Sequence, residues 1–336
     1  MEALYFQTRD ESIVQCTLCP HYCIIKPGQT GKCRVRHNAN GQLHTQVYNN
    51  VSALSADPVE KKPLYHFYPG YNILSVGSFG CNMACSFCQN FDISQLTENV
   101  MQRRRNEISR PVIIERAKKT ESNIGLAFTY NEPTVWFEFM RDLAIDAGEA
   151  GMSTAMVSNG FINPDPLDEL NVYIDAFNID LKAFNDKFYR KYTGSAIKPV
   201  LNTLKKIRSA DRHLELTYLV IPGLNDDKNE FMNCIDWINE NLGQDTVLHL
   251  SRYFPGYNFS SPATPASTLR EMYGIASEKL NYVYLGNIDI PESADTVCPA
   301  CGTKVTTRRA YSTEHLNTAD GSCSACGHLI YQYFRP

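Results

Sequence analysis

The sequence carries three cysteines, Cys81, Cys85 and Cys88, in a segment that follows the apolar stretch 71–76. In a cubane iron–sulfur cluster, each iron takes one thiolate in addition to its bridging sulfides. Three neighbouring cysteines therefore hold three of the four irons and leave the last iron open to another ligand. The spacing predicts a [4Fe-4S] cluster whose open iron binds a substrate.

A second group of cysteines, near the C-terminus, consists of two Cys-x2-Cys pairs that are each followed by glycine. Such pairs form tight turns that direct their thiolates at one ion, and four thiolates leave no open position. We therefore expect a structural zinc, with iron as the alternative. A nucleic-acid module is the rival interpretation, but the tail has few fixed positive charges for phosphate contacts. The predicted ligands are Cys298, Cys301, Cys323 and Cys326.

A third group, near the N-terminus, suits either zinc or a second iron–sulfur cluster. Gly28 and Gly31 permit a tight reversal of the chain that brings the last cysteine of the group to the other three. His21 is a possible replacement for one thiolate. We favour one closed four-cysteine zinc site, and the cluster stays open as the alternative. The members of this group are Cys16, Cys19, Cys23 and Cys33.

Length and composition indicate one large globular domain with small additions, because 336 residues, 43% of them hydrophobic, are ample for a core. The net charge of -4 offers no general attraction to nucleic acid or to anionic membranes. No apolar stretch reaches the roughly 18 residues of a membrane-spanning helix, and the N-terminus has no signal pattern. We expect a cytoplasmic protein, and in that reducing compartment the cysteines are expected to bind metals rather than form disulfides.

Between residues 70 and 285, short β-rich runs alternate with amphipathic helical stretches. Strands are predicted at 73–76, 124–128, 154–158, 176–181, 214–221 and 246–250, and helices at 111–120, 134–149, 165–170, 197–209, 228–242 and 263–280. Strands that are apolar on both faces are typical of a parallel sheet covered by helices. The pattern predicts an α/β fold, a partial (β/α)6 barrel over 69–290, with a Cys-rich N-terminal extension, 1–68, and a zinc-ribbon-like tail, 291–336.

The Cys-x3-Cys-x2-Cys pattern directly after the first strand of such an array is similar to the signature of radical S-adenosylmethionine (SAM) enzymes. This resemblance implies that Cys81, Cys85 and Cys88 ligate the cluster and that the open iron binds the amino and carboxylate groups of SAM. It further implies that SAM is cleaved to a 5'-deoxyadenosyl radical, which abstracts hydrogen from the target. Phe87 is then expected to pack near the adenine.

Polar residues at successive strand ends are where this resemblance places further contacts to SAM. Glu132 follows the second predicted strand, where the family usually carries a Gly-Gly-Glu motif for the methionine ammonium, although the glycines are absent here. Ser158 and Asn159 after the third strand, and Asp180 and Lys182 after the fourth, are similar to segments with which activating enzymes of glycyl radical proteins hold SAM. The plainer alternatives are a charge at a helix N-terminus, a turn and a surface ion pair.

Two residues of the sixth predicted strand complete the candidate contacts. Arg252 suits the SAM carboxylate because its planar guanidinium can pair with a carboxylate through two hydrogen bonds, and a surface salt bridge is the alternative. His249 and Ser251 alternate with leucines, so the polar pair is expected to share one face of the strand, toward the barrel lumen. A hydrogen-bonded core histidine is the alternative for His249.

Motifs along nearly the whole chain resemble those of the AmmeMemoRadiSam system radical SAM enzymes, a family related to activases of the pyruvate formate-lyase type. They are Cys-x2-Cys-Pro-His-Tyr-Cys at 16–23, the segment 57–67, and Arg-Tyr-Phe-Pro-Gly-Tyr at 252–257. The resemblance implies AMME-type and Memo-type proteins as possible partners. As a radical SAM enzyme, the protein would also need an electron donor such as flavodoxin or ferredoxin.

Three functions remain open from the sequence. The first is direct modification of a peptide, protein or small molecule, and the second is an activase that installs a glycyl radical on a partner enzyme. We rank direct modification first, because the eight-cysteine insert of many activases is absent. The third is a zinc-stapled interaction or nucleic-acid module without catalysis. The aromatic segment 57–68 is expected either to cover the radical site or to pack on the barrel wall.

Overall fold

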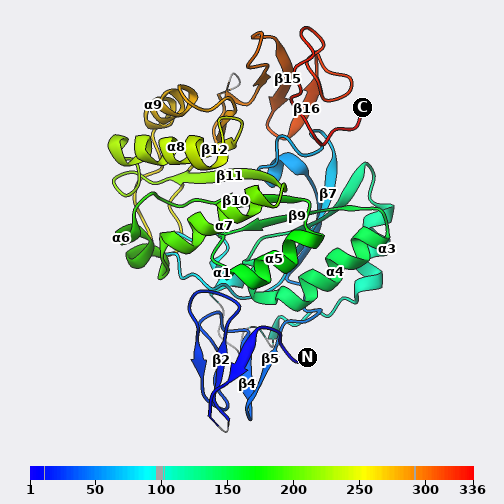
Figure 1. Ribbon diagram of the computed structural model, residues 1–336, viewed down its shortest axis with the longest axis vertical. Helices are drawn as coiled ribbons and strands as arrows, with labels where there is room; N and C mark the ends of the chain where they lie inside the picture. The colour runs from blue at the N-terminus through cyan, green and yellow to red at the C-terminus, as the bar shows by residue number, and fades with distance from the viewer. Residues whose placement is uncertain (11, 96–100, 102, 291–292) are drawn as a thin grey trace.

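The computed structural model describes residues 1–10, 12–95, 101, 103–290 and 293–336, and its centre is one eight-stranded sheet (Figure 1). Strands β7 to β13 are parallel and lie in chain order, and β6 pairs with β7 as an antiparallel edge strand. The strands are β6 (Ala53–Pro58), β7 (Asn72–Gly77), β8 (Asn123–Phe128), β9 (Ser153–Ser158), β10 (Ala176–Asp180), β11 (His213–Val220), β12 (Val247–Arg252) and β13 (Val283–Gly286).

A helix follows each of the strands β7 to β12, and these helices cover one side of the sheet (Figure 1). The longer ones are α3 (Arg110–Lys119), α4 (Phe137–Glu149), α5 (Pro164–Tyr173), α7 (Ile197–Ser209), α8 (Lys228–Leu242) and α9 (Ala266–Ser277). The shorter ones are α1 (Phe91–Ser94), α6 (Asp186–Phe188), η1 (Val59–Lys61), η2 (Pro133–Trp136) and η3 (Tyr189–Thr193). The predicted mostly parallel α/β fold is confirmed. The six predicted strands correspond to β7 to β12, and their bounds agree with the prediction within a few residues. The strand order is open, with β6 and β13 at the two edges, so the described strands do not close into a full barrel.

The N-terminal region forms two small antiparallel sheets below the central sheet in Figure 1. They contain β1 (Phe6–Thr8), β2 (Val14–Cys16) and β3 (Ile24–Ile25), and β4 (Arg36–Ala39) with β5 (Gln42–Thr45). A buried ion pair fixes this region to α4, because Arg36 Nη1 lies 3.0 Å from Glu138 Oε1 and both side chains are at most 1% exposed. The central sheet begins earlier than the predicted boundary at residue 69, since β6 lies within 1–68.

The C-terminal tail forms a three-stranded antiparallel sheet beside β13, at the opposite end of the molecule (Figure 1). Its strands are β14 (Thr296–Val297), β15 (Lys304–Arg309) and β16 (Ser312–His315). Arg308 joins the tail to the barrel by donating from Nη2 to the backbone O of Tyr65, and its guanidinium lies 4.4 Å from the centre of the Tyr65 ring. The predicted start of the tail, at 291 and 292, lies outside the described residues.

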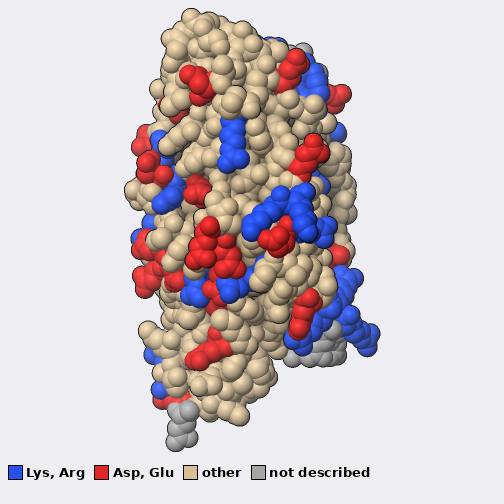
Figure 2. Space-filling view, turned by 90° about the vertical axis from the view of Figure 1, so that its right-hand side faces the viewer, with Lys and Arg blue, Asp and Glu red and all other residues tan. Residues whose placement is uncertain are grey.

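Charged side chains of both signs are intermingled on the face drawn in Figure 2. Among the described residues, no helix is long and apolar enough to cross a membrane.

Candidate active site

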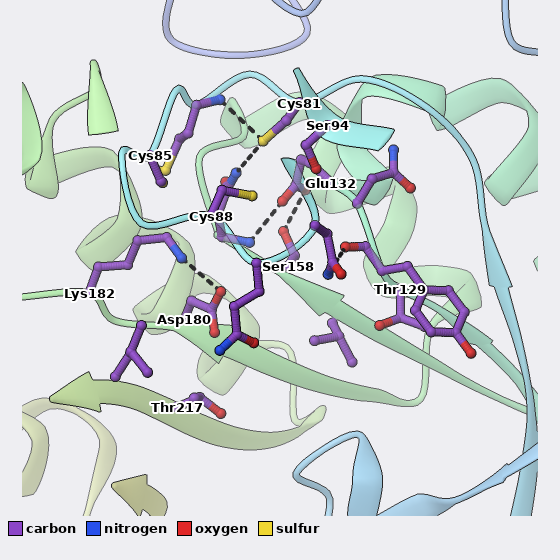
Figure 3. A pocket seen from close by; sticks show the side chains of 18 of the residues that line it. Cys81, Cys85, Cys88, Ser94, Thr129, Glu132, Ser158, Asp180, Lys182 and Thr217 are labelled. Atoms are coloured by element: carbon purple, nitrogen blue, oxygen red, sulfur yellow. Dashed lines mark hydrogen bonds and ion pairs between the residues drawn. The ribbon is translucent and has the colours of Figure 1, made fainter. Parts of the chain in front are cut away.

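A cavity of about 470 Å³ opens at the carboxyl ends of the central strands, and the three clustered cysteines line it (Figure 3). In a parallel sheet, the side chains that follow successive strands meet at this edge, which is where parallel barrels place their reactive groups. Nine of the residues singled out from the sequence line the cavity: Cys81, Cys85, Phe87, Cys88, Glu132, Ser158, Asn159, Asp180 and Lys182.

The cysteine loop after β7 is fixed by hydrogen bonds from neighbouring strand ends. Asn131 after β8 accepts from the Ser78 N–H at 2.9 Å and donates from Nδ2 to the backbone O of Gly80 at 2.9 Å. The N–H of Ala84 donates to the backbone O of Thr193 at 2.8 Å. The loop therefore has a defined shape before any cofactor binds, which lowers the entropic cost of binding.

The spacing of the thiols distinguishes the cysteine groups. Within residues 1–10, 12–95, 101, 103–290 and 293–336, only the C-terminal cysteines offer three or more ligand atoms that all lie within 4.8 Å of one another. The Sγ atoms of Cys81, Cys85 and Cys88 line one cavity but are spread more widely. A single ion draws its thiolates close together, whereas a cubane separates them because each binds a different iron. The central set therefore fits a cluster better than it fits zinc.

Burial keeps these thiols protonated in the absence of a metal. It raises the pKa of Cys85 to about 11, although Lys182 acts in the opposite direction. Burial also raises the pKa of Cys81 well above its usual range, and the Glu132 carboxylate adds to this effect. Since a metal requires thiolates, loading the site must release protons.

Glu132 connects the ends of β8 and β9 through a fully buried network. Its Oε1 accepts from the hydroxyl of Ser158 at 2.7 Å and from the N–H of Thr134 at 3.0 Å, and its Oε2 accepts from the N–H of Asn159 at 2.8 Å. Burial nevertheless raises the pKa of Glu132, with these hydrogen bonds opposing the shift. The Nδ2 of Asn159 also lies 3.7 Å from the Sγ of Cys81. The network thus places a carboxylate beside the cysteine loop.

Asp180 and Lys182, which both line the cavity, form an ion pair with Lys182 Nζ 2.8 Å from Asp180 Oδ2 (Figure 3). Burial acts to lower the pKa of Lys182, but the charge of Asp180 and the hydrogen bond to it outweigh burial, so the pKa lies above its usual range. Lys182 is therefore a permanent cation next to the cysteine loop.

Two predicted contacts lie outside this cavity. His249 is 3% exposed and donates from Nε2 to Glu215 Oε2 at 2.6 Å. It does line a second cavity with Ser251, in agreement with their predicted common face. Arg252 donates from Nε to the backbone O of Thr264 at 2.8 Å. The structure does not bring His249 or Arg252 together with the other nine residues.

The sequence interpretation missed several residues that line the cavity, most notably Lys62. Its side chain is 3% exposed, its Nζ lies 2.7 Å from Asp57 Oδ2, and it lies 4.5 Å from the centre of the Tyr130 ring. The hydroxyl of Tyr130 also donates to Asp57 at 2.7 Å. The segment 57–68 therefore has two parts, because Lys61 and Lys62 line the cavity whereas the aromatic residues that follow pack against β12, β13 and the tail. A buried lysine is recognisable only from its tertiary partners.

The two outer cysteine groups lie in separate places. In the tail, Cys298 Sγ lies 3.6 Å from Cys326 Sγ, and Cys301 Sγ lies 3.7 Å from Cys323 Sγ. The N-terminal group lines a small, mostly apolar pocket of its own. The members of this group are Cys16, Cys19, Cys23 and Cys33.

Comparisons with known proteins agree with this fold. The family model of the Radical SAM superfamily matches residues 75–235, which include the cysteine loop and the strand ends up to β11. An uncharacterized protein of Methanocaldococcus jannaschii is 38% identical over 98% of this chain and 98% of its own length. The pyruvate formate-lyase 1-activating enzyme of Escherichia coli K12 is 28% identical over 44% of this chain and 61% of its own length.

Among solved structures, SuiB of Streptococcus suis bound to SAM has a TM-score of 0.52 at 16% identity and covers 69% of this chain and 54% of that chain, which shows the fold alone. The fold and the cysteine loop together define a radical SAM enzyme. The chain belongs to the radical SAM superfamily, and it shares a full-length family with the Methanocaldococcus protein. Membership implies a [4Fe-4S] cluster and SAM as cofactors.

Proposed function

We propose that Cys81, Cys85 and Cys88 hold the [4Fe-4S] cluster and that SAM binds at its open iron within the 470 Å³ cavity. The observation that carries this proposal is that the cysteine loop and the polar residues of three successive strand ends line one cavity. When bound, the reduced cluster supplies the electron that cleaves SAM to the 5'-deoxyadenosyl radical. The protein's own residues orient SAM and exclude water.

Each polar group has a matching role toward SAM. Glu132 retains lone pairs beyond its three internal hydrogen bonds and is suited to the methionine ammonium. Lys182 is the cation in the cavity wall that is suited to the carboxylate or a ribose oxygen, with Asp180 holding it in place. Phe87 is 4% exposed, and its exposed edge is suited to the adenine.

A second cavity of about 770 Å³ adjoins the first and is suited to the substrate. The two cavities share Lys61, Gln89, Ser251 and Asn287 in their walls, so a molecule in the second cavity lies beside the radical site. Its walls carry both charged and apolar side chains, including His249. This continuity favours direct hydrogen abstraction from a peptide, protein or small molecule that enters the second cavity.

An activase function is the second candidate, in which a partner protein presents a glycine to the radical. The similarity to pyruvate formate-lyase 1-activating enzyme supports it, but this similarity covers only 44% of the chain. The partners of the present chain are proposed to be a flavodoxin- or ferredoxin-type electron donor and, from the sequence motifs, AMME-type and Memo-type proteins.

The C-terminal group is proposed to bind a structural zinc. A tetrahedral ion with Zn–S bonds of about 2.3 Å separates its thiolates by about 3.8 Å. The two sulfur–sulfur distances of 3.6 and 3.7 Å are close to this value. None of these four cysteines lines the cavity of the cysteine loop or the adjoining second cavity, so this metal is proposed to take no part in the reaction.

Product analysis tests the proposed function and separates its two forms. The anaerobically reconstituted protein is incubated with SAM and a one-electron reductant, and 5'-deoxyadenosine is quantified. We expect 5'-deoxyadenosine from the wild type and none from the C85A variant. A modifier releases it in many turnovers with a changed substrate, whereas an activase releases it once for each protein glycyl radical. Equal yields from wild type and C85A would contradict the proposal.

A further inference from the structure

The N-terminal cysteine pocket is a second place where thiols converge, and it does not have the geometry of the C-terminal set. All four cysteines line it: Cys16, Cys19, Cys23 and Cys33. Within the described part of the chain, however, no three of these Sγ atoms lie within 4.8 Å of one another, whereas the C-terminal set does. One zinc ion needs sulfur–sulfur distances of about 3.8 Å. The N-terminal thiols are therefore spread more widely than the ligands of a single zinc ion.

A buried cation faces this pocket with an unused donor. Arg36 is 1% exposed and lines the pocket, and its Nη1 is paired with Glu138 at 3.0 Å. Its Nε has no hydrogen-bond partner, although a buried, unpaired N–H costs about 1–3 kcal/mol. Four thiolates around a cluster carry net negative charge and accept hydrogen bonds at sulfur. The charge of Arg36 is paired with Glu138, and an anionic cluster would supply an acceptor for its free Nε–H.

The remaining walls suit a cluster that is protected from water. Leu18, Ile25 and Val135 line the pocket beside the cysteines. His21 is not available as a ligand, because its Nε2–H donates to the backbone O of Asn82 at 2.7 Å and its Nδ1 lies 3.4 Å from Lys32 Nζ. The cysteines are thus the ligands that this pocket offers.

The pocket also lies directly against the cysteine loop of the active site. Asn82, which receives the His21 hydrogen bond, is the residue after Cys81. Gly80, the residue before Cys81, has φ +85°, and a Cβ built on it would lie 2.7 Å from the backbone O of Cys33. The chain segments that carry the two cysteine sets are therefore in van der Waals contact.

From this geometry we infer that Cys16, Cys19, Cys23 and Cys33 bind a second [4Fe-4S] cluster, fully ligated by cysteine and packed against the loop that holds the first. The sequence left zinc and a second cluster open at this site and favoured zinc, and we infer the cluster instead. The inference does not depend on what reacts at the first site.

Metal and sulfide analysis of the anaerobically purified full-length protein tests the inference. The C81A/C85A/C88A variant leaves the N-terminal pocket intact. We expect about eight irons and one zinc per wild-type chain, and about four irons, four sulfides and one zinc per chain of this variant. The variant should also show Mössbauer spectra of a four-iron cluster. An iron-free variant with two zincs per chain, or with an empty N-terminal pocket, would overturn the inference.

The reciprocal variant, C19S/C23S, supplies the matched measurement. We expect this variant to lose about four irons, those of the N-terminal cluster. Its reduced first cluster should still respond to SAM in electron paramagnetic resonance. If the C19S/C23S protein keeps all of its iron, the N-terminal cluster is disproved. If instead C81A/C85A/C88A keeps all of its iron, the proposed function fails, so the two ideas fail separately.

Discussion

The backbone N–H of Asn159 donates to Glu132 Oε2 at 2.8 Å, so the end of β9 is tied to a carboxylate that follows β8. The Asn159 side chain continues from there to the cysteine loop through Asn82, whose Oδ1 accepts from Asn159 Nδ2 at 2.9 Å. One buried carboxylate thus positions parts of three consecutive strand-end segments. Its proposed contact with SAM and its positioning role act on the same site.

The E132Q variant should cleave SAM about 10- to 100-fold more slowly, which corresponds to the loss of charged hydrogen bonds worth about 1.5–3 kcal/mol. The amide nitrogen of glutamine cannot accept the N–H of Asn159 or the hydroxyl of Ser158. Production of 5'-deoxyadenosine and the dissociation constant of SAM measure the effect. The surface variant E115Q, which removes an exposed carboxylate paired with Lys118, is the control and should cleave SAM at the wild-type rate.

The C301S variant should lose its zinc and loosen the tail, because a structural metal contributes its binding energy to folding. Zinc content and limited proteolysis of the tail report the change. The matched control is C234A, which removes the buried cysteine of α8 that belongs to no cysteine group. C234A should lower the free energy of unfolding without any loss of zinc. A C301S protein with full zinc and a protected tail would refute the assignment.

Stability should fall as the pH falls below about 6.5, in part because of His66. Burial lowers the pKa of His66 to about 3, and its neutral ring donates from Nδ1 to Ile330 O and accepts from Tyr284 Oη. Below the unfolded pKa of about 6.5, the unfolded chain binds a proton that the folded chain does not, so this residue removes about 1.4 kcal/mol per pH unit. Denaturant unfolding between pH 6 and pH 4 should show that the free energy of unfolding of H66Q depends less steeply on pH than that of the wild type, by one bound proton. An unchanged pH dependence would contradict this.

Glu215 should add a further loss of stability at lower pH. Burial acts to raise its pKa, but hydrogen bonds from His213 and His249 lower it well below the usual range. A depressed folded pKa contributes stability that is present above about pH 4.3 and is lost as the pH falls further. E215Q should cost about 3–5 kcal/mol at pH 7, because it removes the charged acceptor of several buried hydrogen bonds, and it should lose less stability than wild type below pH 4. Thermal unfolding of E215Q and of the wild type, at pH 7 and below pH 4, measures the difference.

The G80A variant should destabilise the contact between the two cysteine segments. A residue with a side chain at φ +85° costs about 1–2 kcal/mol, and the added Cβ would also clash with Cys33 O and Val35 at 2.7 Å. We expect the free energy of unfolding to fall by at least about 2 kcal/mol. G274A in α9 is the control, because its Cβ meets nothing within 4 Å, and it should be neutral or slightly stabilising. Equal stability of the two variants would contradict this account.

The six central strands could be predicted from sequence because strands that are buried on both faces form short apolar runs between amphipathic helices. β13 has only four residues and β6 is an antiparallel edge with a polar sequence, so neither stands out locally. The cysteines and the strand-end polar groups could be predicted because each lies in a short motif directly after a predicted strand, which can be read from neighbouring residues in the sequence. Lys62 could not, since its burial depends on Asp57 and Tyr130. For the N-terminal cysteines, spacing does not determine how far apart the thiols lie in space.

Electron paramagnetic resonance of the reduced, reconstituted protein with and without SAM tests the central claim most directly. The signal of the first cluster is obtained as the difference between wild type and the C81A/C85A/C88A variant, which removes any contribution from the N-terminal pocket. We predict that SAM shifts the g values of this difference signal, because it binds the open iron. A difference signal that SAM leaves unchanged would contradict the account.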